Sequence, residues 1–351
     1  MIKRIFYILI LLLTISCYSI DERKEINHYD KQIVDAVEIL FNVNAAHSTK
    51  AIVDSTFLPR NTYFGVYGYV HGVFVGKEMS GGTSGYIIQN AKYNYDGTSN
   101  NDRKYYWPKA DNNDDLKVRF VAYYPYYLSY SIIDINNRGN ITYNFNNYTK
   151  DDVMIAITDT VLPDASYTES NKYIIPLTFK HVLSLVTFKA KIQPDSLINR
   201  VVIKEITLSN PIDTAAYINV DSRGVSDSIF LTYRTKGKNL YNFISSPTTV
   251  TSKDTYSTVS NDVILPQRLD FIKVKLRFDT YFNIAEDSVH YDRVVEKYIS
   301  INEDVNGKPY VDEWLPGYHY IYTYYITENQ INFDATVAPW YEPFEYIIDV
   351  K

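Results

Sequence analysis

Apolar and polar residues alternate along short stretches of the chain, with turn-forming residues between them. The alternation is clearest in the middle of the chain, over residues 185–192. One face of this stretch is apolar and the other is mostly polar: Val186, Phe188, Ala190 and Ile192 against Thr187, Lys189 and Lys191. A period of two is typical of a half-buried strand, so the pattern predicts a strand over residues 176–192 that opens a second domain.

Similar runs on both sides of this strand make up most of the chain. They cover residues 62–75, 200–208, 229–233, 263–266, 273–278, 294–301, 318–326 and 331–337. Turn signals rich in glycine, asparagine and aspartate lie at residues 81–85, 96–97 and 137–139. A chain of 351 residues has room for two cores. The pattern predicts an all-β protein with two tandem β-sandwich domains, at residues 33–170 and 171–351.

The first residues have the pattern of a secretory signal. Lys3 and Arg4 precede an apolar run at residues 5–13, which is shorter than the roughly 20 residues of a membrane-spanning helix. We expect residues 1–16 to be removed and the polar residues 17–32 to form a tether. Cys17 resembles the lipid-carrying cysteine of a bacterial lipobox; an incidental cysteine is the alternative. It is the only cysteine, which excludes disulfides within the chain.

Composition and charge narrow the classes of partner. The 35 tyrosines favour pleated, half-buried surfaces and therefore β structure. Tyrosine clusters at residues 123–127 and 318–325 could stack on sugar rings or pack within strands, and the sequence leaves both readings open. The formal net charge is -6 and the basic residues are scattered, so we expect no nucleic-acid partner.

Local motifs for catalysis or metal binding are incomplete. Residues 111–115 offer alternating oxygen ligands, but Leu116 and Ala122 stand where a calcium loop needs glycine and glutamate. The glycines at residues 81–85 lack the lysine and the strand-to-helix context of a phosphate loop. His181 and His319 fall in predicted strands, where packing or a hydrogen bond is the ordinary role. We therefore expect no enzyme, no metal site and no cofactor.

Several short motifs occur in one order over nearly the whole chain. They are the lipobox at Cys17 and residues 106–108 (YWP), 120–126 (FVAYYPY), 152–156 (DVMIA), 179–184 (FKHVLS), 264–267 (ILPQ), 314–320 (WLPGYHY) and 338–340 (APW). Each motif alone is short and carries little information. Taken together and in this order, they resemble the fimbrillin-like (Mfa-like and FimA-like) surface lipoproteins of Bacteroidales.

The resemblance implies two transthyretin-like or immunoglobulin-like β-sandwiches and a role as a subunit of a type V pilus. It also implies an assembly route: a lipoprotein precursor loses its first strand to a trypsin-like protease, and the groove takes a donor strand from the next subunit. This route is physically reasonable, because a lost strand leaves unpaired backbone groups and an apolar groove that an extended segment can fill.

The same route can be mapped onto this sequence. The removable strand would lie within residues 34–43, and the cut would follow Lys50, where the family usually has arginine, or Arg60. The candidate donor strand is the C-terminal tail, whose apolar face consists of Phe344, Tyr346, Ile348 and Val350. As a strand, residues 344–351 reach roughly 26 Å, enough to fill a groove along one sandwich. The alternative is that the tail is the last strand of its own domain.

We therefore expect a structural, non-enzymatic pilus subunit at the bacterial surface, either in the shaft or as an adhesive tip. Its expected partners are other pilin subunits, the outer membrane through lipid on Cys17, a trypsin-like protease, and a ligand on host or bacterial cells. Two alternatives follow from the same sequence. One is a monomeric surface lipoprotein that binds glycans through its tyrosine clusters, and the other is an uncleaved pilus anchor subunit.

Overall fold

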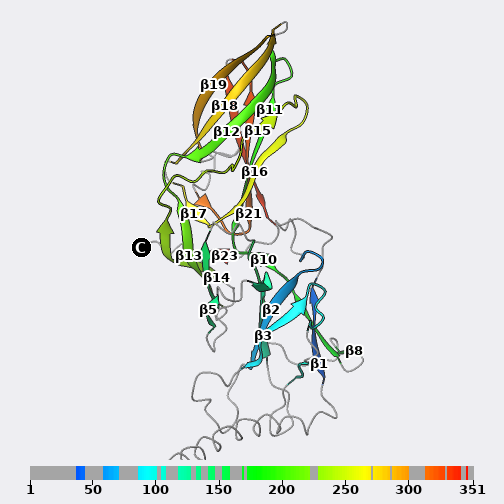
Figure 1. The fold of residues 1–351 in the computed structure, drawn as a ribbon. Coiled ribbons are helices and arrows are strands. Elements are labelled where there is room, and N and C mark those ends of the chain that lie inside the picture. The colour runs from blue at the N-terminus through cyan, green and yellow to red at the C-terminus, as the bar shows by residue number, and fades with distance from the viewer. Residues whose placement is uncertain are drawn as a thin grey trace, which may run out of the picture.

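The computed structural model describes residues 37–43, 58–70, 86–100, 104–107, 118–127, 132–135, 141–146, 152–158, 168–169, 172–221, 228–269, 272–284, 287–299, 313–328, 330–340 and 345–346. Figure 1 shows a group of strands at each end of an elongated molecule and a further sheet between them. The regular elements of the described residues are strands, numbered β1 to β23, so the all-β prediction is confirmed. Within these residues there is no helix of the length and apolarity that crossing a membrane requires.

The N-terminal group of strands encloses the first core. Its larger sheet has the order β10-β7-β4-β2-β3, formed by Lys180–His181, Met154–Ile157, Val118–Tyr124, Tyr63–Val70 and Tyr86–Asn94. The smaller sheet has the order β1-β9-β8, formed by Glu38–Val43, Lys172–Leu177 and Thr168–Glu169. Apolar side chains from both sheets, among them Ile39, Phe120 and Ile175, meet in one buried cluster. This packing is that of a β-sandwich.

The C-terminal group has two four-stranded sheets. One has the order β16-β11-β21-β22, formed by Ser257–Ile264, Ser184–Ile192, Tyr318–Ile326 and Ile331–Pro339. The other has the order β15-β12-β18-β19, formed by Thr248–Val250, Ile198–Leu208, Lys273–Ile284 and Asp287–Tyr298. A two-stranded ladder joins β17 (Gln267–Arg268) to β20 (Glu313–Trp314).

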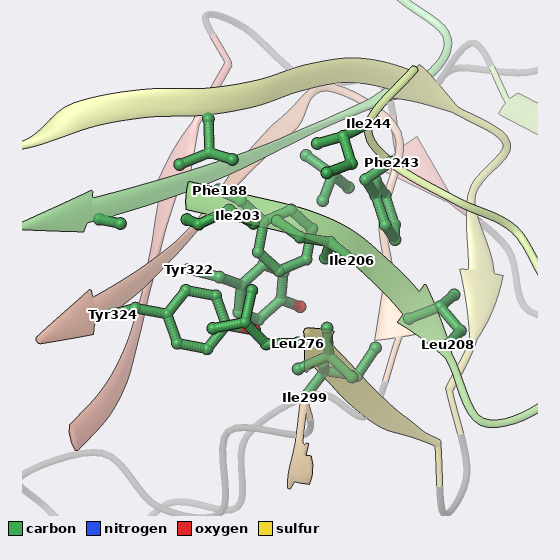
Figure 2. Close-up of a cluster of buried hydrophobic side chains, with 14 of the residues drawn as sticks. Phe188, Ile203, Ile206, Leu208, Phe243, Ile244, Leu276, Ile299, Tyr322 and Tyr324 are labelled. Carbon is green, nitrogen blue, oxygen red and sulfur yellow. The ribbon is translucent and has the colours of Figure 1, made fainter. Parts of the chain in front are cut away.

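The second core lies between these two sheets. Figure 2 shows the rings of Phe188, Tyr322 and Tyr324 among aliphatic side chains of the facing strands. The rings of Phe188 and Tyr322 stack with centroids 5.1 Å apart. The inward face that alternation predicted for residues 185–192 therefore packs as expected, with Val186, Phe188, Ala190 and Ile192 all buried.

A third sheet connects the two halves of the chain. Its order is β23-β14-β13-β6-β5, formed by Glu345–Tyr346, Ser228–Lys236, Asp213–Asp221, Ile141–Asn146 and Ile132–Ile135. The hairpin β5–β6 leaves the N-terminal group and pairs antiparallel with β13, from Ala215 opposite Asn146 to Val220 opposite Ile141. Backbone hydrogen bonds thus join the two sandwiches (Figure 1).

A buried seam lies where the two sandwiches meet. It is an apolar cluster that draws Val121 and Ile155 from one half and Leu185 and Val263 from the other. Trp340, which follows β22, stacks on His181 with ring centroids 3.7 Å apart and planes at 15°. His181 Nδ1 lies 3.1 Å from Asp152 Oδ1. His181 is fully buried in this arrangement, which agrees with a packing role rather than a surface site.

The strand expected over residues 176–192 is divided in the structure. Residues up to Leu177 belong to β9, which pairs with β1, and Lys180–His181 forms β10, which pairs with β7. The chain then crosses the seam, where Val182 N donates to Val153 O, and enters the second sandwich as β11. Residues 172–181 therefore pair with N-terminal strands, whereas the sequence assigned them to the second domain. The division into domains at residue 171 stays an expectation.

Candidate functional site: the groove around strand β1

Strand β1 is short and alternates in burial along its length. Its inward side chains Ile39, Phe41 and Val43 are 1%, 3% and 5% exposed. Its other face carries Glu38 and Leu40, which are half-buried, and an exposed Asn42. The sequence predicted a strand in this region, and the structure confirms one over Glu38–Val43. One face of β1 is therefore part of the N-terminal core.

Both edges of β1 carry backbone hydrogen bonds. On one edge it pairs parallel with β9 over six positions, from Glu38 opposite Lys172 to Val43 opposite Leu177. On the other edge Ile39 N donates to Tyr105 O at 2.8 Å, and Phe41 N donates to Gly97 O at 3.3 Å. Trp107 N donates to Val37 O at 3.0 Å on the same edge. The strand thus lies between β9 on one edge and, on the other, the turn at Gly97 and the segment 105–107. We call the surroundings of the strand the β1 groove.

The centre of the β1 groove is an aromatic pocket filled by Phe41. The ring of Phe41 meets Tyr93, Phe120 and Phe64 edge-on, with centroid distances of 4.8, 5.3 and 6.4 Å. Edge-to-face pairs of this kind contribute about 0.5–1.5 kcal/mol beyond the apolar area they bury. The pocket is therefore shaped for an aromatic side chain.

A glycine allows the turn at residues 95–98 to approach β1 closely. Gly97 has φ of +84°, and a Cβ added there would stand 1.8 Å from the carbonyl oxygen of Phe41. Both the left-handed backbone conformation and the missing side chain are needed at this position. The sequence identified Asp96-Gly97 only as a turn, because its contact with β1 depends on tertiary packing.

The polar groups beside β1 have contrasting environments. Lys104 Nζ lies 3.3 Å from Glu38 Oε2, and the lysine is largely exposed. The hydroxyl of Tyr93 is buried and has no hydrogen-bond partner among the described residues. Burial raises the pKa of Tyr93 well above its usual value, and Tyr105 and Glu38 add to the effect. The wall of the groove therefore carries one cation at its rim and one unsatisfied hydroxyl inside.

The residues that the sequence proposed as sites are placed unevenly. Cys17, Lys50, Phe344, Ile348 and Val350 lie outside the described residues. Arg60 is exposed on a turn, next to Leu58, which is fully buried in the N-terminal core. Tyr346 lies in β23, which pairs parallel with β14 through Ser228 and Ile229. The structure therefore does not bring Tyr346 and β1 together within one chain.

The tyrosine clusters are mostly core residues. Tyr123, Tyr124, Tyr320, Tyr322 and Tyr324 are all buried. Tyr126 is half-buried, and Tyr127 is exposed beyond the end of β4. These positions support the packing interpretation of the clusters and leave the buried rings unable to stack on a sugar.

His319 belongs to a hydrogen-bonded chain on the outer face of β11 and β21. Its Nε2 lies 2.8 Å from Thr187 Oγ1, which donates to Asn261 Oδ1 at 2.5 Å. Burial lowers the pKa of His319 to about 4, with a further contribution from Lys189. Thr187 is only 3% exposed, so its hydroxyl is not available to a substrate. The three hydrogen-bonded side chains therefore have a packing role on the sheet. The described residues contain no group of three or more metal-ligating side chains.

Solved structures share the fold of this chain. A fimbrial protein from Bacteroides vulgatus has a TM-score of 0.56 at 13% identity, and the match covers 87% of this chain and 99% of that one. A proposed cell adhesion protein from Bacteroides uniformis has a TM-score of 0.51 at 16% identity, covering the same shares of the two chains. The comparison with curated proteins gave no match.

The sequence itself matches a family described as fimbrillin-like. The match runs over residues 49–340 and thus spans both sandwiches and the seam between them. It begins after β1 and ends at Trp340, before the tail. Because the match covers well over half of the chain and the fold agrees with it, the chain belongs to the fimbrillin-like family.

Proposed function

We propose that this chain is a structural, non-enzymatic subunit of a surface fimbrium, and that it assembles by exchanging β1 for a strand of a neighbouring subunit. Family membership supports the fimbrial role. The observation that carries the exchange is the position of β1: it fills the N-terminal core, yet it is the first strand of the described residues. One cut between β1 and β2 would therefore separate it from the rest of the sandwich.

Loss of β1 would leave a site that strongly favours a replacement strand. The backbone of β9 would lose a six-residue partner, and the carbonyls of Tyr105 and Gly97 would lose their donors. Unpaired backbone groups in a buried groove are costly. Burying each of Ile39, Phe41 and Val43 contributes about 1.5–3 kcal/mol, which the empty groove would forfeit. An extended segment with alternating apolar residues restores both the backbone hydrogen bonds and the buried apolar contacts.

Lys50 is the better of the two candidate cleavage positions. A cut after Lys50 keeps Leu58, which is fully buried, with the body of the sandwich. A cut after Arg60 would remove Leu58 together with β1, and Arg60 stands in a tight turn where Thr62 Oγ1 donates to Pro59 O at 2.6 Å. Proteases act on extended segments, so this turn disfavours cleavage at Arg60.

The C-terminal tail is the proposed donor strand. In the described part of the tail, Glu345–Tyr346 pairs with β14 through two positions, whereas β1 pairs with β9 over six. A subunit with both a groove and a donor strand fits the shaft of a polymer, whereas a tip subunit needs only the groove. The precursor would reach the outer membrane through lipid on Cys17, and a trypsin-like protease would then release it.

The N-terminus of the protein in isolated fimbriae tests this proposal. We expect fimbriae to contain a chain that begins at Ala51, and a Lys50→Gln variant to stay at the membrane as an unpolymerised precursor. Arg60→Gln is the matched control and should enter fimbriae normally. Fimbriae whose subunits begin at Cys17 would show instead an uncleaved anchor, and a protein that stays monomeric after cleavage would refute the exchange.

A further inference from the structure

We propose that the outer face of the sheet β16-β11-β21-β22 binds an acidic sugar. The ammonium of Lys191 is the partner of the sugar carboxylate, and the ring of Tyr256 packs against the apolar face of the sugar ring. Both residues lie on the C-terminal sandwich, outside the β1 groove and the seam. One chain can bind one sugar without strand exchange, so this inference does not rest on the proposed function.

The site is built from two neighbouring rows of side chains that cross the sheet. Along β11 and β21 the rows alternate with Ala190 and Tyr324, which are fully buried, so the rows stand on the rigid second core. From β16 to β22, one row is Thr258, Lys189, Thr323 and Asp334, and the other is Tyr256, Lys191, Tyr325 and Asn332. We call these two rows the lysine–tyrosine face.

Two tyrosine rings hold the ammonium of Lys191 in place. Lys191 Nζ lies 4.8 Å from the ring centroid of Tyr256 and 5.4 Å from that of Tyr325. The two rings meet edge-on, with centroids 5.4 Å apart and planes at 85°. Attraction between the ammonium and the ring faces positions the charge before any ligand arrives. A positioned lysine loses less side-chain freedom on binding than a mobile one, which favours affinity.

The charge of the lysine–tyrosine face favours an anionic ligand. Its charged residues are Lys189, Lys191 and Asp334, whereas the whole chain has a formal net charge of -6. Neither lysine forms an ion pair with another described residue. Asp334 Oδ1 accepts a hydrogen bond from Ala335 N at 2.8 Å. The two lysines, about 7 Å apart along β11, therefore offer two ammonium groups to one acidic ligand.

The uncharged groups of this face favour a sugar over an acidic peptide. Tyr256 is 38% exposed, and partial burial and a hydrogen bond with Tyr325 raise its pKa to about 12. Its hydroxyl therefore stays protonated at neutral pH. The hydroxyls of the two tyrosines and of the exposed Thr258 can each donate and accept hydrogen bonds. A sugar ring has an apolar C–H face and a rim of hydroxyls, which matches an aromatic ring beside hydroxyl groups.

A second lysine in the chain also lies between two tyrosines. Lys92 Nζ is 3.8 Å from the ring centroid of Tyr63 and 5.5 Å from that of Tyr126. Tyr126, however, stacks on the fully buried Tyr123, with centroids 6.4 Å apart and planes at 18°. This arrangement belongs to the packing at the edge of the seam, so Lys92 provides a matched control for Lys191.

Calorimetric titration of the uncleaved chain from residue 18 tests the class of ligand. The probes are a hexasaccharide of alternating glucuronic acid and N-acetylglucosamine, and a trisaccharide that ends in sialic acid. We expect at least one of them to bind, and its carboxyl-reduced, neutral form to bind about 10-fold more weakly or worse. If neither acidic sugar binds, the inference is wrong. A glutamate peptide of equal charge that binds as tightly would show attraction by charge alone and would also overturn it.

Variants test the residues. Lys191→Ala and Tyr256→Ala should each weaken binding about 10-fold or more, whereas Lys191→Arg should retain most of it, because it keeps the charge and the ring contacts. Lys92→Ala and Lys273→Ala are the controls; Lys273 lies over the single ring of Tyr298 on the other sheet. Thermal unfolding checks that every variant is folded. Loss of binding in Lys92→Ala, with Lys191→Ala unaffected, would place the site on the other sandwich and refute the proposal.

Assembled fimbriae separate this inference from the proposed function. A polymer that repeats the lysine–tyrosine face should bind a surface coated with the acidic sugar about 100-fold more tightly than the uncleaved monomer, because many sites act together. Monomer that binds sugar but never polymerises would contradict the fimbrial proposal and leave the sugar site standing. Fimbriae that assemble but do not bind the coated surface would refute the sugar site alone.

Discussion

At the scale of single residues, Gly97 matters because it lies against β1, where there is no room for a side chain. A Cβ there would stand 1.8 Å from the carbonyl oxygen of Phe41, and the backbone φ of +84° is one that residues with a side chain rarely adopt. We expect Gly97→Ala to reduce the free energy of unfolding by more than about 2 kcal/mol and to loosen β1. Chemical denaturation measures the loss, and Gly237→Ala, at a glycine with no positive φ, is the control. Equal losses would mean that the contact with β1 is unimportant.

A second prediction at this scale concerns the contribution of Phe41 to stability. Its ring is 3% exposed and touches three other rings, so Phe41→Ala should cost about 3–5 kcal/mol of stability. Asn42→Ala is the matched control, because Asn42 follows Phe41 on the same strand and is exposed. Thermal unfolding of the uncleaved protein measures both variants. If Phe41→Ala costs no more than Asn42→Ala, the strand is held by its backbone and not by its buried face.

The lowered pKa of His319 leads to a prediction of how stability depends on pH. Its pKa in the folded chain is lowered to about 4 from the usual 6.5, chiefly by burial. Between these values the unfolded chain binds the proton that the folded chain excludes, so the contribution of His319 to stability is present above pH 6.5 and is lost as the pH falls toward 4. We expect His319→Gln to weaken this decline, measured as the difference in unfolding free energy between pH 7 and pH 4.5. An unchanged slope would exclude His319 as its source.

At the scale of elements, alternation in the sequence predicted which residues form strands and which face is buried. It succeeded for β1, β11, β18 and β21, where apolar residues recur at every second position. It did not predict the break near residue 178, because a period of two records one buried face and says nothing about the partner strand. Residues 172–177 alternate as well as β11 does, yet they pair with β1 in the other sandwich.

The groove could be predicted only in part. An alternating run near the N-terminus predicted a strand, and the structure confirms a strand with one buried face over Glu38–Val43. Its removal stays a proposal. Its parallel pairing and the two segments that cover its second edge could not be foreseen, since Gly97, Lys104 and Tyr105 are distant from β1 in sequence. No local pattern records such a contact; a set of homologous sequences with paired changes would have provided a signal.

At the scale of the whole molecule, the two sandwiches are joined by a shared sheet and a buried seam and not by a simple linker. The hairpin β5–β6 pairs with β13, and Trp340 stacks on His181 across the seam. Stability of each half should therefore depend on the other. A fimbrial subunit under tension would also benefit from such a junction, because backbone pairing and apolar packing both resist separation of the halves.

Trp340 tests this coupling. It is 2% exposed and packs in the cluster that connects the two halves. We expect Trp340→Ala to cost about 3–5 kcal/mol and to split a single unfolding transition into two, because the halves lose their shared core. Trp340→Phe keeps an aromatic ring against His181 and should retain one transition. Calorimetry distinguishes the outcomes; a single, merely lowered transition for Trp340→Ala would show that the shared sheet alone couples the halves.

The most direct test of strand exchange uses the purified chain from residue 18 with a site-specific protease sequence in place of residues 44–50. Light scattering and electron microscopy follow the protein before and after cleavage, alongside a variant that ends at residue 342. We predict that only the cleaved chain with its tail forms linear polymers, because it alone has both an open groove and a donor strand. Polymers from the truncated variant, or a cleaved full-length chain that stays monomeric, would contradict the account.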